Sequence, residues 1–239
     1  AMEMEQHIAH VERHFGRALE TPVRAYLLRR DTMPGTVTGG FAPTNSAFQF
    51  PLFTVEGKED FETIRSGNPF YPYMFIHELT KLSLVDPARP PLILADQKSG
   101  PLTKTNYLTR WFREGLANYA EFLVYEKLRE RVVEGEDYVP LSSFESNHVF
   151  QQPLSALATV GPELFNWSQF DDPNHDRDYL NAAMGLFILL EHRFGDEAIR
   201  KVMDTLEQQY YVDGQVIINA INSTLNTDVQ QLVQGFDLM

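Results

Sequence analysis

The order of hydrophobic and polar positions divides the chain into a mixed N-terminal part and a mostly helical remainder. A helical spacing of apolar residues over about residues 4–18 places Ile8, Val11 and Phe15 on one face. Three later stretches alternate or carry β-branched residues and are separated by Gly, Pro and Asn turn signals; these predicted strands cover residues 23–28, 36–41 and 48–53. We therefore expect one helix followed by a small β-rich lobe.

Helical patterns dominate from Tyr71 onward. The segment 75–82 has no Gly or Pro, and the segment 111–131 is apolar on almost every side, so both are expected to be buried helices. Residues 178–207 predict two helices that are separated at Gly195, a residue type typical of helix C-terminal ends. Two more short helices are expected in the tail.

These patterns together predict the α+β fold class in a single domain of residues 1–239. Residues 1–67 are expected to form an N-terminal lobe with one helix and a small mixed β-sheet, and residues 68–239 a helical lobe. The prediction places a cleft between the two lobes.

The composition narrows the classes of function. The chain has 239 residues, 43% of them hydrophobic, which is enough for a sizeable core. A formal charge of −13 disfavours binding to nucleic acids and to anionic membrane surfaces, because both carry negative charge. The absence of cysteine excludes disulfides, thiol nucleophiles and cysteine zinc sites. No apolar run approaches the roughly 20 residues of a membrane helix.

Two of the expected helices carry charged residues in apolar surroundings, and these are the candidates for chemistry. The first contains His77-Glu78-x-x-Lys81, and the second contains Trp111-x-x-Glu114-Gly115-x-Ala117-Asn118-Tyr119. In the arrangement H-E-x-x-H, residues i and i+4 share one helical face and bind zinc, while the Glu after the first His accepts a proton from water. The first segment has this pattern except at its last position.

The two segments resemble those of the gluzincin metallopeptidases, and the likeness spans roughly residues 20–205 in consistent order. The resemblance implies that His77 and Glu114 are zinc ligands, that Glu78 is the catalytic base, and that Asn118 holds the ring of His77 from the second coordination shell. It also implies that Tyr179 donates to the oxyanion. The stretch Gly39-Gly40-Phe41 resembles the edge strand that pairs with extended substrate in these enzymes.

Lys81 departs from the family pattern, which has histidine there. A protonated lysine has no lone pair for zinc, and deprotonation from a pKa of about 10.4 is opposed by the neighbouring carboxylates. We expect the ammonium of Lys81 to lie at or beside the metal's place and to neutralise Glu78 and Glu114. Only His77 and Glu114 then remain as ligands, and two ligands rarely retain zinc.

The sequence thus predicts a degenerate gluzincin-like peptidase homologue without catalytic zinc, which binds an extended peptide or protein segment along Gly39–Phe41. One alternative is an active zinc peptidase in which His175 or a solvent ligand replaces the missing histidine. A second is a hydrolase that uses Glu78 and Glu114 without metal. Oligomeric state stays open, and the location is expected to be secreted or periplasmic if a leader was removed from the natural product and cytoplasmic otherwise.

Most of the other titratable residues considered are expected to lie at the surface rather than in the site. His7, His10 and His14 share one helix and are predicted to lie on a solvated face. Arg113 is expected to point outward. Two predictions remain open for Glu121, which follows Glu114 by seven residues: it lies in the second shell of the site, or it pairs with a nearby arginine.

Overall fold

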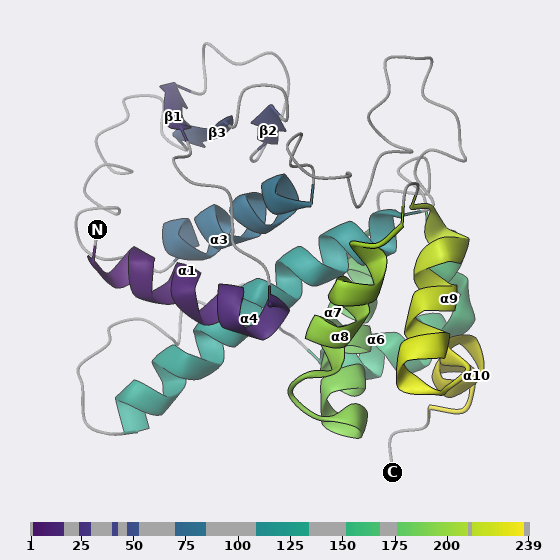
Figure 1. Cartoon of the computed structure of the whole chain (residues 1–239). Helices are drawn as coiled ribbons and strands as arrows, with labels where there is room; N and C mark the ends of the chain where they lie inside the picture. The colour runs from purple at the N-terminus through teal and green to yellow at the C-terminus, as the bar shows by residue number, and fades with distance from the viewer. Residues whose placement is uncertain are drawn as a thin grey trace.

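The structure is a computed structural model, and its helices pack on one another to form the body of the molecule (Figure 1). It describes residues 2–16, 24–29, 40–42, 47–52, 70–84, 109–133, 152–167, 176–209 and 212–236. The helices are α1 (Met2–Phe15), α3 (Phe70–Ser83), α4 (Arg110–Val133), α6 (Pro153–Val160), the 3₁₀ helix η4 (Gly161–Asn166), α7 (Asp176–Phe194), α8 (Ala198–Leu206), α9 (Gly214–Leu225) and α10 (Val229–Gln234).

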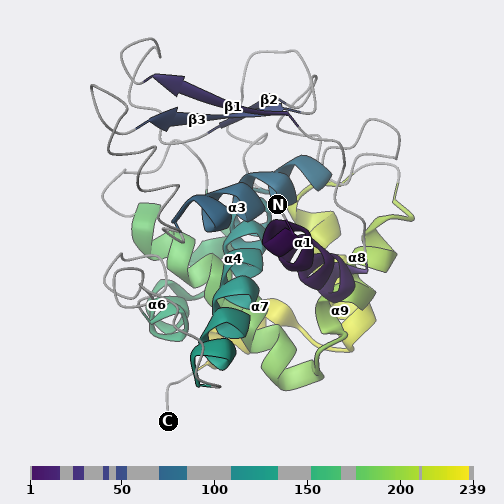
Figure 2. The same cartoon turned by 90° about the vertical axis from the view of Figure 1, so that its left-hand side faces the viewer.

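Three short strands lie on the side of α3 that faces away from α4 in both views (Figures 1 and 2). They are β1 (Arg24–Arg29), β2 (Gly40–Ala42) and β3 (Ala47–Leu52). Their order is β1-β3-β2, in which β3 runs parallel to β1 and antiparallel to β2.

The α+β class predicted from the sequence, with a β-sheet lobe as half of the architecture, is wrong, because the described body of the molecule is a helical fold. Every core residue whose burial is described lies in a helix or directly beside one. Strand patterns report only a local preference, whereas the fold class depends on which elements bury one another. In this chain the described burial comes from helices packed on helices.

The helix α7 is central to this packing, since it contacts both α4 and α6. Glycines allow the two close approaches. A Cβ on Gly115 of α4 would lie 2.8 Å from the carbonyl oxygen of Ala183, and a Cβ on Gly185 of α7 would collide with the backbone of Pro153. Glycine is therefore required at both crossings, because any side chain would force the helices apart.

The short C-terminal helices begin at side-chain caps. The carboxylate of Asp213 accepts a hydrogen bond from the backbone N–H of Val216 at the start of α9. Asp228 accepts from two backbone N–H groups at the start of α10. Such caps satisfy amide groups that have no partner within the helix.

None of the described helices combines the length and the apolar character that crossing a bilayer requires.

Candidate functional site

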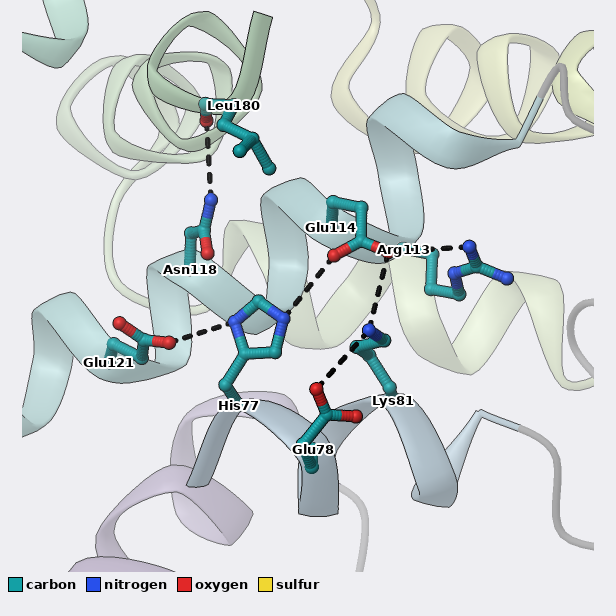
Figure 3. A network of polar contacts seen from close by, with 8 residues as sticks. All are labelled: His77, Glu78, Lys81, Arg113, Glu114, Asn118, Glu121 and Leu180. Atoms are coloured by element: carbon teal, nitrogen blue, oxygen red, sulfur yellow. Dashed lines mark hydrogen bonds and ion pairs between the residues drawn. The ribbon is translucent and has the colours of Figure 1, made fainter. Parts of the chain in front are cut away.

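The candidate site lies where α3 and α4 contact each other (Figures 2 and 3). His77 and Lys81 are four residues apart on α3, so they project from one face of that helix. Glu114 projects toward them from α4, one turn after the start of that helix (Figure 3). The structure therefore brings together the residues that the sequence motifs singled out, between two buried helices rather than in a cleft between a sheet and a helical lobe.

Glu114 is at the centre of this site. Its Oε2 lies 3.3 Å from Nε2 of His77, and its Oε1 lies 3.4 Å from Nζ of Lys81 (Figure 3). The same Nζ lies 3.5 Å from Oε1 of Glu78, so one ammonium contacts a carboxylate from each helix. All four side chains are at least about nine-tenths buried, with 12% of the Lys81 side chain exposed.

Arg113 also faces this site, contrary to the expectation that it points outward. Its Nη2 lies 3.3 Å from Oε1 of Glu114, and only 12% of its side chain is exposed. Burial by itself would raise the pKa of Glu114, but the charge of Lys81, and then His77 and Arg113, lower it well below its ordinary value. Glu114 is accordingly a stable anion.

The ring of His77 is held from its other side by Glu121. Nδ1 of His77 lies 2.8 Å from Oε1 of Glu121, a contact whose length is that of an ion pair although its direction is poor for a hydrogen bond. Burial by itself would lower the pKa of His77, but Glu114 and then Glu121 raise it from 6.5 to about 9. His77 is therefore an imidazolium at neutral pH.

Glu121 is the residue whose part in the site the sequence left undecided. It is 5% exposed, and burial raises the pKa of its carboxyl although His77 opposes the rise. The only sequence signal for its position was the spacing of seven residues from Glu114, which places both on one helical face. That spacing is equally compatible with an unrelated ion pair, so it could not decide between the two.

Asn118, which the resemblance placed against the ring of His77, has a different described contact. Its Nδ2 donates to the carbonyl oxygen of Leu180, 3.4 Å away on α7 (Figure 3). The contact with the ring of His77 that the resemblance implied for Asn118 is made by Glu121. Asn118 instead connects α4, which carries Glu114, to the central helix.

Tyr179 lies near the start of α7, where its ring stacks on Trp167 with centroids 5.7 Å apart. The guanidinium of Arg110 lies 4.4 Å from the centroid of the same Trp167 ring. Such contacts stabilise the packing of α4 and α7 against the end of η4. They give Tyr179 a structural part that the sequence pattern did not predict.

Other predicted site residues are described only in part. Gly40 and Phe41 lie in β2, which forms one end of the strand order and contacts α3. Gly39 and the candidate third ligand His175 lie outside the described residues.

The arrangement does not fit the catalytic zinc that the resemblance implies. Zinc sites of this kind need three protein ligands with lone pairs, and here Nζ of Lys81 lies where the third would be, beside Glu114. Within the described part of the chain, moreover, no three His, Asp or Glu side chains converge as metal ligands.

Chemically, the site is a buried network of opposite charges. The cations of Lys81 and Arg113 and the imidazolium of His77 face three carboxylates, so the charges nearly balance. One buried oxygen, Oε2 of Glu78, has no hydrogen-bond partner among the described residues. It can accept a hydrogen bond from a water molecule, the usual partner of such a group.

Comparison with known proteins adds no further assignment. No protein-family model matches the chain, and no curated protein or solved structure matches it significantly.

Proposed function

We propose that this chain is a gluzincin-like peptidase homologue in which an ion pair has replaced the catalytic metal, and that it binds an extended peptide or protein segment rather than cleaving it. The single observation that supports the proposal is the position of Lys81, whose Nζ lies between carboxylates of α3 and α4 at 3.4 and 3.5 Å. A cation supplied by the chain offsets the charge that zinc would otherwise offset.

Lysine cannot substitute for the metal in catalysis. An ammonium does not bind the attacking water through a lone pair and does not lower the pKa of that water as zinc does. Glu78 and Glu114 are also already engaged with Lys81. The proposed site is therefore a structural connection between two helices.

The peptide-binding part of the proposal is supported by β2. This strand pairs with β3 on one side, and none of the described strands pairs with its other side. An edge of this kind can accept an extended segment through backbone hydrogen bonds. The negative charge of the whole chain favours a segment rich in lysine and arginine.

Metal analysis tests the main proposal. Protein purified without chelator should contain well under one zinc per chain, whereas Lys81→His should bind zinc after the metal is added, because it supplies the third lone pair. Lys81→Gln is the matched control, since it removes the same charge without adding a strong ligand. Stoichiometric zinc in the unaltered protein would contradict the proposal.

A fluorescein-labelled, unstructured peptide rich in lysine and arginine serves as a probe for both binding and cleavage. We expect saturable binding without cleavage, and weaker binding for Gly40→Pro, which removes a backbone N–H from β2. Cleavage that a chelator stops would instead support an active zinc peptidase. Cleavage that persists with chelator and disappears in Glu78→Gln would support a metal-independent hydrolase.

A further inference from the structure

A second group of titratable residues lies on α1, away from the α3/α4 site. This helix crosses α4 and contacts α3 and α8 (Figures 1 and 2). Val11 and Phe15 are fully buried beneath it, and the ring of Phe15 stacks on Tyr119 of α4 with centroids 6.3 Å apart. The packing of α1 thus covers the ring of Tyr119 on α4.

His7 on α1 is buried, which contradicts the predicted solvated face at that position, whereas His10 and His14 are only partly buried. His7 is 4% exposed, and Nε2 of His14 lies 2.9 Å from Oε1 of Glu191 on α7. The rings of His10 and His14 are 5.2 Å apart. Residues 7, 10 and 14 share one helical face because they are three and four apart, and that face also carries the buried Val11.

The surroundings of His10 disfavour a second positive charge. Burial, the neighbouring His14, Lys127 on α4, and then Arg13 and His7 lower the pKa of His10 from 6.5 to about 4. His10 is therefore neutral while α1 is packed in place. Protonating it there would place a cation among other cations, partly removed from water.

The remaining charged groups around α1 offset only a small part of this cost, through the Glu191 carboxylate, for which His10 is the last-ranked of the interactions that lower its pKa. The Glu191 carboxylate contacts His14, and although burial opposes it, His14 and Tyr119 keep the pKa of Glu191 below its ordinary value. From α8, the side chain of Arg200 lies against Gly16 at the end of α1. The charged residues of α3 are engaged with Glu114 and with one another.

We propose that α1 is a pH-sensitive latch, which opens from α4 and α7 more often at mildly acidic pH and then exposes the aromatic face that Phe15 and Tyr119 share. In the detached helix His10 is surrounded by water and takes up a proton at a pH near its ordinary pKa. In the packed helix it stays neutral at that pH. Each proton bound on detachment favours the detached state as the pH falls. When the pH falls below the ordinary pKa range of a glutamate, protonation of the Glu191 carboxyl also removes its ion pair with His14.

The linkage sets the size of the effect. The pKa of His10 is about 6.5 in the detached helix and about 4 in the packed helix. The equilibrium constant for detachment is therefore at most about 30-fold larger at pH 5 than at pH 7.5. His10 is only half-buried, and water and salt screen its neighbours, so we expect about tenfold.

The chain has no cysteine, which allows a single introduced thiol to report the opening of α1. Val11→Cys places a thiol under the helix, and Ala182→Cys places one inside α7; both positions are fully buried. The rate of reaction with 4,4′-dithiodipyridine, divided by the rate for a short peptide with the same cysteine, gives the protection at pH 7.5 and at pH 5.

We expect the thiol at position 11 to be less protected than the thiol at position 182 at both pH values. Its protection should fall about tenfold at pH 5, and His10→Gln should remove most of that fall. His192→Gln, which alters an exposed histidine on α7, should retain it. Equal protection of the two thiols would overturn the proposal, because α1 would then open only with the whole chain; so would an unchanged pH response in His10→Gln.

Discussion

At the scale of single residues, Lys81 decides the character of the site. Its ammonium lies within 3.5 Å of Glu78 and Glu114, in surroundings that hold little water. A buried charge that loses its partner costs far more free energy than an exposed one, because the partner left behind cannot be solvated. Lys81 therefore matters to stability as well as to the proposed replacement of the metal.

Replacing Lys81 with methionine keeps most of the length and volume of the side chain and removes its charge. We expect Lys81→Met to lower the free energy of unfolding by about 3 kcal/mol, since Glu78 and Glu114 remain buried with less compensation. Urea unfolding monitored by circular dichroism measures the change. Lys201→Met is the matched control: its pair with Glu197 is more than half exposed, so the loss should stay below about 0.5 kcal/mol.

His77 gives the site a pH dependence of its own. Because its pKa is raised from 6.5 in the unfolded chain to about 9 in the folded one, its contribution to stability is complete below pH 6.5 and is lost as the pH rises through 9. The urea midpoint should therefore fall between pH 6.5 and pH 9.5, and His77→Gln should flatten the profile in that interval. An equally steep fall in the variant would show that another group is responsible.

At the scale of elements, the crossing of α6 over α7 depends on Gly185. A methyl group there would meet the carbonyl of Pro153, which is backbone and cannot move aside as a side chain can. We expect Gly185→Ala to lower the free energy of unfolding by about 2–3 kcal/mol in thermal or urea unfolding. Gly235→Ala is the control, because its Cβ would meet only an ordinary contact at 3.4 Å; a similar loss in both variants would argue against close helix packing as the cause.

The elements themselves were largely predictable from the sequence, whereas their assembly was not. The helix boundaries follow from periodicity and from stop signals such as Gly195, which has a positive φ of 88° after α7. The predicted importance of the β-rich lobe failed because alternation in a short segment does not reveal what that segment packs against. In the same way, the motifs indicated that His77 and Glu114 belong together, but the contact of Glu121 with His77 depends on how α3 and α4 are packed.

At the scale of the whole molecule, one continuous core joins the helices from α1 to α10. Both tryptophans, Trp111 and Trp167, lie in it and are completely buried. We therefore expect tryptophan fluorescence and far-ultraviolet circular dichroism to report the same urea transition at pH 7.5. Two separate transitions would show that the core is divided into parts that unfold independently.

The close contact at Gly115 has a mechanical consequence for the ion network. Gly115 presses against Ala183 of α7, while the adjacent Glu114 reaches across to α3. The size of residue 115, on the face of α4 that packs against α7, therefore determines how far Glu114 extends toward His77 and Lys81. The ion network therefore depends on the packing of the opposite face of α4. A single methyl group added at Gly115 contacts no charged residue, but it would shift α4 relative to α3 and change the distance from Glu114 to each of its charged partners.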